Sequence, residues 1–254
     1  MAVASERSQE AYSRRGKVSL WVFMYGVGYV LFHIVPPFLS HEIRVGLTVG
    51  DVFDTLTPFA MILLIWRLFG MLGRDAAEDS SSGSLFGARI VVVLGAISFV
   101  EGHGMHLSAN AIARHLAPTR NSPAFVLDYL FDEVLSHILW DSGFILISIG
   151  LLTAALSCRK ADSTSSPILV SAGSLLYGFT YFCNGIEGQT VVFTLPLSLV
   201  VPAIVIFAIR HRRLKLSHPI ILFYVLAYLW ALLLFLYWGI RNRGFVEFSE
   251  LGWI

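Results

Sequence analysis

The amino-acid sequence predicts an all-α membrane protein, a bundle of about seven transmembrane helices. Of its 254 residues, 56% are hydrophobic and only 14% are charged, whereas soluble globular proteins are about one quarter charged. The mean hydropathy is +0.72, and long apolar runs recur along the whole chain. The net charge of +1 argues against nucleic acid as a partner, because proteins that bind it carry a basic surface.

Seven stretches are long enough, or nearly so, to cross a bilayer, which takes about 20 mostly apolar residues. They lie at about 20–39, 52–72, 89–113, 124–157, 167–186, 191–209 and 220–240. Pro36 and Pro37 lie near the end of the first, and a Ser/Gly/acidic loop at 73–87 follows the second. Pro123 opens the fourth, which is too long for one upright span, so an interfacial stretch or a tilted helix is expected there. Pro196 and Pro202 predict kinks in the sixth.

The distribution of Lys and Arg predicts the orientation, because loops on the inner side carry an excess of these residues. With the N-terminus inside, thirteen of the eighteen fall on the inner side and five on the outer side. We therefore expect an odd number of spans, the N-terminus inside and the C-terminus outside. Residues 1–18 form a polar, basic cytoplasmic segment, 19–241 the seven-helix domain and 242–254 a short outer tail.

Acidic and histidine side chains gather in the outer half of this predicted bundle. They come from five spans and comprise His33, Asp54, Glu101, His103, His106, Glu133, His137, Asp141 and Glu187. Ionisable groups at membrane depth are expensive and usually face the interior of the protein, where they serve a function. We therefore expect one polar cavity that opens towards the outside.

Helical spacing arranges several of these residues on shared faces, since positions three and four apart are neighbours on a helix. His103, His106 and Asn110 share one face of the third span. Glu101 points elsewhere if that helix is regular, although Gly102 and Gly104 permit local unwinding. Glu133, His137 and Asp141 form a second stripe on the fourth span.

Imidazole and carboxylate groups together favour a metal site of zinc, iron or manganese. The predicted metal ligands are His103, His106, Glu133, His137, Asp141 and Glu187. Their number exceeds what one tetrahedral ion needs, which fits two metal ions between bundle helices. It fits equally one ion with a carboxylate that orients a histidine and another that acts as a base. Glu101, Glu187 and Asp141 are the predicted catalytic groups.

The leading hypothesis is therefore a metal-dependent membrane enzyme, either a hydrolase or a non-haem iron oxidase. Its cofactor would be a divalent metal, zinc or iron and up to two ions, and its substrate a lipid or another small apolar molecule taken from the bilayer. The alternative is a proton or divalent-cation transporter that uses the same cluster, and a buried polar network with a structural role is the third interpretation. We expect the protein in a plasma or inner membrane. The sequence leaves its oligomeric state open.

Overall fold

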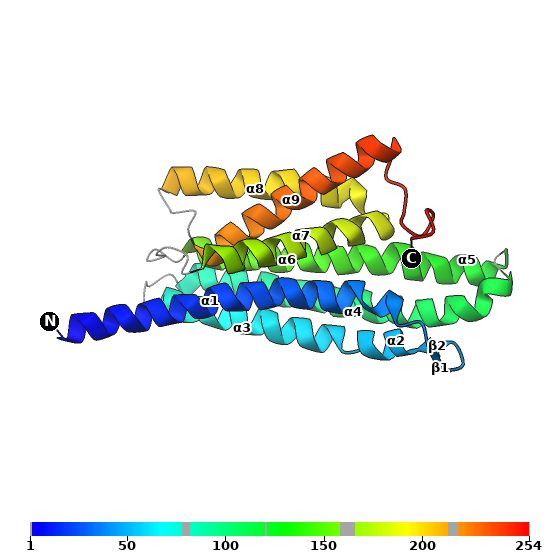
Figure 1. The fold of residues 1–254 in the computed structure, drawn as a ribbon, viewed down its shortest axis with the longest axis horizontal. Coiled ribbons are helices and arrows are strands. Elements are labelled where there is room, and N and C mark those ends of the chain that lie inside the picture. Colours follow the sequence, from blue (N-terminus) through cyan, green and yellow to red (C-terminus); the bar gives the residue numbers. More distant parts are fainter. Residues whose placement is uncertain (1, 78–81, 120, 158–165, 213–217, 254) are drawn as a thin grey trace.

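The computed structural model describes residues 2–77, 82–119, 121–157, 166–212 and 218–253, which form a bundle of long, roughly aligned helices (Figure 1). The first part of the chain contains α1 (Ala2–Ile34), the 3-10 turn η1 (Pro36–Phe38), strands β1 (Glu42–Arg44) and β2 (Leu47–Thr48), α2 (Val49–Asp54), α3 (Thr57–Ala77), α4 (Ser82–Leu116) and the 3-10 turn η2 (Ala117–Thr119). The second part contains α5 (Pro123–Tyr129), the π-helical segment η3 (Leu130–Leu135), α6 (Ser136–Ser157), α7 (Pro167–Glu187), α8 (Val191–Arg212) and α9 (Pro219–Asn242).

Every apolar run predicted as a span is helical. In the described ranges, six helical stretches are long and apolar enough to cross a membrane: Lys17–Phe38, Val49–Gly73, Gly83–Leu116, Pro123–Ser157, Val191–His211 and Pro219–Asn242. The predicted fifth span, α7, is not among them. The fold as a multi-helix membrane protein is thus confirmed. The number of seven spans and the orientation stay predictions. Five of the residues on which the orientation depends lie outside the described residues: Arg120, Arg159, Lys160, Arg213 and Lys215.

Three helices begin at a proline that follows a capping residue. Ser122, Ser166 and His218 precede α5, α7 and α9, and the side chain of each accepts a backbone N–H of the first turn. Proline suits the first helical position because its missing N–H would have no partner there and its φ is already helical. The sequence therefore specifies locally where these helices start.

The long fourth run is one continuous helical path with a change of winding. It consists of α5, the six π-helical residues of η3 and then α6. A π-helix has a longer hydrogen-bonded turn than an α-helix, and such segments are often found at functional sites. The side chains that precede Ser136 are therefore offset from the regular helical stripe that the sequence predicts.

Helices α4 and α6 approach each other through glycine. A Cβ atom on Gly95 would lie 2.7 Å from the Gly143 carbonyl oxygen, and one on Gly102 would lie 2.5 Å from the Ser136 carbonyl oxygen. Ser98 Oγ also donates a hydrogen bond to the Leu139 carbonyl across the same interface, at 2.7 Å. Small residues permit such close backbone contact in membranes, where lipid tails leave no hydrophobic force to hold helices together.

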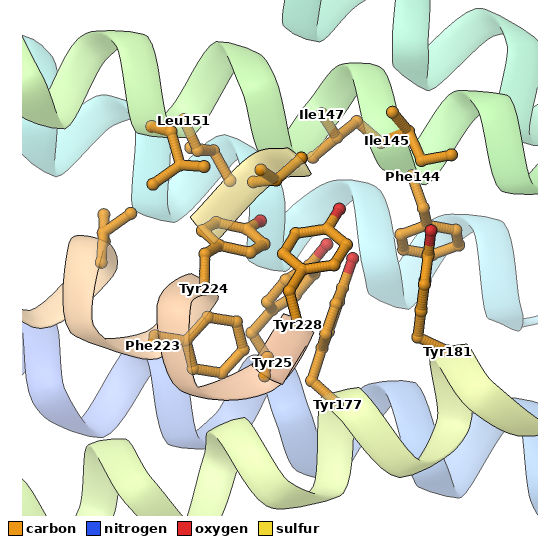
Figure 2. Packing of buried hydrophobic residues seen from close by; sticks show 14 of the residues in the cluster. Tyr25, Phe144, Ile145, Ile147, Leu151, Tyr177, Tyr181, Phe223, Tyr224 and Tyr228 are labelled. Atoms are coloured by element: carbon orange, nitrogen blue, oxygen red, sulfur yellow. The ribbon is translucent and has the colours of Figure 1, made fainter. Parts of the chain in front are cut away.

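A group of buried tyrosines fills the middle of the bundle. Figure 2 shows rings from α7 and α9, among them Tyr177 and Tyr228, pointing towards α6. The Tyr177 hydroxyl lies 3.2 Å from Ser148 Oγ, and the Tyr181 hydroxyl donates to the Thr194 carbonyl at 3.2 Å. Tyrosine combines a large apolar ring with a polar tip that seeks a partner, so these residues join four helices through both packing and hydrogen bonds.

Two side chains at the end of α4 fix the β1–β2 hairpin. Arg114 donates to the Gly46 carbonyl at 2.8 Å and forms an ion pair with Asp51, while His115 Nε2 lies 2.8 Å from the Val45 carbonyl. Val45 has a φ of 50°, a conformation that a β-branched residue rarely adopts. The contacts with α4 hold this turn in its strained conformation.

Candidate functional site

Four histidines surround the ring of Trp140 on α6. The ring centroids of His33, His103, His106 and His137 lie 4.9, 4.7, 5.6 and 5.7 Å from it. His33 comes from α1, His103 and His106 from α4, and His137 from α6. We call these five residues the histidine cluster. The structure thus brings together the three histidines predicted as metal ligands, with a tryptophan at their centre.

Each of the three predicted histidines lies beside a different carboxylate. His103 Nε2 lies 3.0 Å from the Asp54 backbone carbonyl and 3.5 Å from its Oδ1. Asp54 also accepts from Thr57 Oγ1 at 2.7 Å. These contacts tie α4 to the α2–α3 junction.

The other two pairs involve η3. His106 Nδ1 lies 2.8 Å from Asp132 Oδ1, and His137 Nε2 lies 3.7 Å from Glu133 Oε2. Asp132 is buried and was not among the predicted ligands. The π-helical winding of η3 explains the omission, because a regular helix continued from α6 directs Glu133 rather than Asp132 along the predicted stripe.

Several buried polar atoms of this region have no hydrogen-bond partner. Within the described residues, they include both ring nitrogens of His33, Nδ1 of His103, Nε1 of Trp140 and Oδ1 of Asp141. A buried polar atom without a partner costs about 1–3 kcal/mol. The His33 ring is instead enclosed by aromatic rings, with the Tyr29 centroid at 4.3 Å and the Phe144 centroid at 5.6 Å. Packing between aromatic rings therefore holds the histidine cluster together as much as polar contacts do.

The three predicted catalytic carboxylates lie in three separate places. Asp141 is fully buried on α6, where Thr190 donates to its Oδ2. Glu187, at the end of α7, accepts the backbone N–H of Phe248 at 2.8 Å and that of Ser249 at 3.3 Å. Glu101 is exposed on α4. Because α4 is continuous through Gly102 and Gly104, Glu101 does point away from His103, as a regular helix requires.

The C-terminal turn that Glu187 binds is acidic. Burial, followed by the nearby carboxylates of Glu187 and Glu250, raises the pKa of Glu247 above its ordinary value. Trp238 Nε1 donates to the Val246 carbonyl at 2.9 Å and so ties this turn to α9. Glu187 therefore holds the C-terminal segment against the bundle.

The predicted metal ligands do not assemble into one group. Across the part of the chain that the structure describes, no three His, Cys, Asp or Glu side chains are placed so that they could hold a metal ion. The imidazoles and carboxylates meet in pairs, each of which can share a proton. The pairs of His103 with Asp54 and of His106 with Asp132 also join separate segments of the chain, whereas His137 and Glu133 are one helical turn apart. The divalent metal and the catalytic and ligand assignments stay predictions.

Glu101 lines a groove between α3 and α4. The groove has a volume of about 440 Å³, within the usual range for small-molecule sites. Its lining is almost entirely apolar, with one basic and one acidic residue: Ile62, Ile65, Trp66, Phe69, Arg89, Val92, Val93, Ala96, Ile97, Val100 and Glu101. Several of these side chains are exposed on the surface of the spans, so the groove opens towards the bilayer.

Sequence reasoning missed this groove because it depends on which helices are neighbours. One signal was present: Ile62, Trp66 and Phe69 recur at helical spacing on a single face of α3. On the α4 side, Ala96 is small and leaves space opposite this face. An apolar stripe in a membrane helix does not reveal whether it faces lipid or another helix.

Long apolar helices with short connections and a core of buried side chains define a multi-pass integral membrane protein. Within that class, the chain belongs to the ceroid-lipofuscinosis neuronal protein 6 family, whose family model matches residues 17–241. The match covers all seven predicted spans and leaves out only residues 1–16 and 242–254. Which cellular membrane holds the protein stays a prediction.

Two curated relatives support this assignment. The chain is 30% identical over 191 residues to the ceroid-lipofuscinosis neuronal protein 6 homolog of Canis lupus familiaris, covering 71% of this chain and 60% of that protein. It is 30% identical over 187 residues to ceroid-lipofuscinosis neuronal protein 6 of Homo sapiens, covering 69% and 59%. The chain thus spans about three fifths of the length of these relatives. No solved structure matches it.

The family assignment corrects the predicted function. The prediction of a metal-dependent membrane enzyme, or of a proton or divalent-cation transporter, is wrong: the chain is a member of the ceroid-lipofuscinosis neuronal protein 6 family, whose description names neither activity. Both predicted activities required the polar residues at one end of the bundle to converge on one site. In the structure they pair two by two, and Glu101 and Glu187 face different surroundings.

Proposed function

We propose that this protein binds a membrane lipid and holds one of its hydrocarbon chains in the groove between α3 and α4. The observation that supports the proposal is the groove itself, with its apolar lining and its volume of about 440 Å³. Lipid tails are as apolar as the lining, so hydrophobicity alone gives no preference for this place over the rest of the protein surface. Close van der Waals packing of the lipid's hydrocarbon chain against both α3 and α4 would make the groove preferred over the rest of the surface.

Pairs of tryptophan and arginine indicate where the groove lies in the bilayer. The Arg89 guanidinium lies over the Trp66 ring at 5.6 Å, and the Arg67 guanidinium lies over the Trp21 ring at 5.5 Å. Tryptophan and basic residues favour the membrane interface. From this level, the groove extends along α4 to Glu101, twelve residues or about 18 Å further on, which is the depth that a lipid chain occupies.

The test is photolabelling by a phosphatidylcholine that carries a photoactivatable group in its acyl chain. The full chain is reconstituted in phosphatidylcholine nanodiscs, and labelled peptides are quantified by mass spectrometry. Peptides of α3 and α4 should be labelled more strongly than those of α8, whose exposed residues Leu199 and Ile204 report contact with bulk lipid. Equal labelling of all exposed helices would contradict the proposal.

Groove-filling variants make the test specific. Ala96→Trp and Val93→Trp place a large ring in the groove, and both should reduce α3 and α4 labelling to the level of α8. Leu94→Trp is the matched control, because Leu94 is exposed on the same helix outside the groove lining and should leave labelling unchanged. Thermal unfolding of each variant in detergent confirms that it is folded. Undiminished labelling in both groove-filling variants would refute the lipid site.

A further inference from the structure

Glu101 is an ionisable side chain that faces the groove rather than the protein interior. It is exposed on α4 and lines the groove at the end far from Arg89. Other acidic residues at similar depth have protein partners: Asp54 binds Thr57 and lies beside His103, and Asp141 binds Thr190. In the described ranges Glu101 has no hydrogen-bond or ion-pair partner.

A carboxylate at this depth is costly unless something compensates its charge. Charged side chains within the hydrocarbon region usually pair with one another or face water, and they mark sites of function. The basic residue of the groove lining, Arg89, is about 18 Å away along α4 and lies over Trp66. Within the described residues, no basic side chain of the groove lining is close enough to compensate this charge.

A ligand that fits both the apolar lining and the carboxylate is an amphipathic cation. We infer that Glu101 binds the protonated amine of a long-chain lipid amine whose hydrocarbon chain lies in the groove between α3 and α4. This inference rests on the proposed lipid-binding function and names the class of lipid. An ammonium group and a carboxylate attract each other strongly where water is scarce, and a charged partner strengthens their hydrogen bonds.

The surroundings of Glu101 leave room for such a head group. A Cβ atom on Gly104, one turn further along α4, would meet no heavy atom within 4 Å, so the space beside the carboxylate is open. Gly102 has no side chain and lies against α6, and the His103 ring faces Asp54, so neither residue fills that space. The carboxylate is therefore accessible from the bilayer and not from the histidine cluster.

Competition between two ligands with the same chain tests the inference. Hexadecylamine and hexadecanol share a hydrocarbon chain and differ in the head group. Increasing concentrations of each ligand are added to the full chain in zwitterionic nanodiscs. The decrease in labelling of the groove by the photoactivatable phosphatidylcholine is then measured. The amine should compete at about a tenfold lower concentration than the alcohol, as expected for a hydrogen bond to a charged group.

Glu101→Gln should abolish this difference, because the amide keeps the size of the side chain and removes its charge. Competition by the amine and by the alcohol is scored against this variant's own labelling by phosphatidylcholine, so the comparison between them does not depend on the absolute level of labelling. Glu250→Gln is the matched control, since it removes an exposed carboxylate of the C-terminal turn and should leave the tenfold preference intact. A thermal unfolding midpoint no lower than that of the wild type shows that Glu101→Gln is folded.

The possible failures are distinguishable. If neither Ala96→Trp nor Val93→Trp reduces phosphatidylcholine labelling, the groove is not a lipid site and the proposed function fails. If the groove is labelled specifically but the amine and the alcohol compete equally in the wild type, only the inference about Glu101 fails. A preference for the amine that survives in Glu101→Gln would overturn the inference as well.

Discussion

Replacing Gly102 by alanine should destabilise the bundle, because α4 and α6 touch through their backbones at this point. The new Cβ atom would lie 2.5 Å from the Ser136 carbonyl oxygen and 2.6 Å from the Trp140 backbone nitrogen, whereas ordinary contact begins at 3.4 Å. The two helices would have to separate by about 0.9 Å. A gap of that size forfeits roughly a quarter to a half of the dispersion energy of each contact across the interface.

We expect a cost of about 1–3 kcal/mol, the usual range for overpacking. For a chain of this size, that lowers the unfolding midpoint by about 2–4 °C per kcal/mol. The assay is thermal unfolding of detergent-purified protein, followed by circular dichroism at a fixed scan rate. Size-exclusion chromatography beforehand confirms that each sample is homogeneous.

Gly104→Ala provides the matched control on the same helix. A Cβ atom there would meet no heavy atom within 4 Å, so the substitution brings only the higher helix propensity of alanine, worth up to about 1 kcal/mol. Its unfolding midpoint should equal or exceed that of the wild type. If Gly102→Ala were as stable as Gly104→Ala, the close contact between α4 and α6 would be refuted.

Three further perturbations probe other parts of the structure. Burial lowers the pKa of His218 to about 4 from its ordinary value of 6.5. Between these two pH values the unfolded chain binds the proton and the folded chain does not, so the free energy of unfolding decreases as the pH is lowered. Between pH 7.5 and pH 5, denaturant titrations should show that the free energy of unfolding decreases by about 2 kcal/mol more in the wild type than in His218→Asn. Asparagine keeps a side chain that can cap the helix, and equal decreases in the two proteins would contradict the prediction. Arg114→Ala should release the strained hairpin turn and leave Asp51 without its ion-pair partner. Hydrogen exchange at residues 42–48 should then be faster than in the wild type, and unchanged exchange there would count against the contact. Glu187→Gln should loosen the C-terminal turn by weakening the bond to Phe248, and limited proteolysis should then cut after residue 242 sooner, an effect absent if the turn is held by packing alone.

The apolar runs were sufficient to predict the helices. Each run predicted as a span is helical, and Pro123 and Pro219 mark helix starts that the sequence specifies locally. The predicted direction of Glu101 also follows from helical periodicity, since positions two apart point to different faces of a regular helix. These features depend on neighbouring residues alone, which is why a sequence reveals them.

The partners of each polar side chain required the tertiary structure. Whether His106 meets Glu133 or Asp132 depends on the π-helical winding of η3, which shifts the register by a fraction of a turn. The groove depends on α4 lying against α6 through glycine while it stays apart from α3 at Ala96. Composition and spacing place polar groups at one end of the bundle, but distances of a few ångströms between helices decide whether those groups form one site or several pairs.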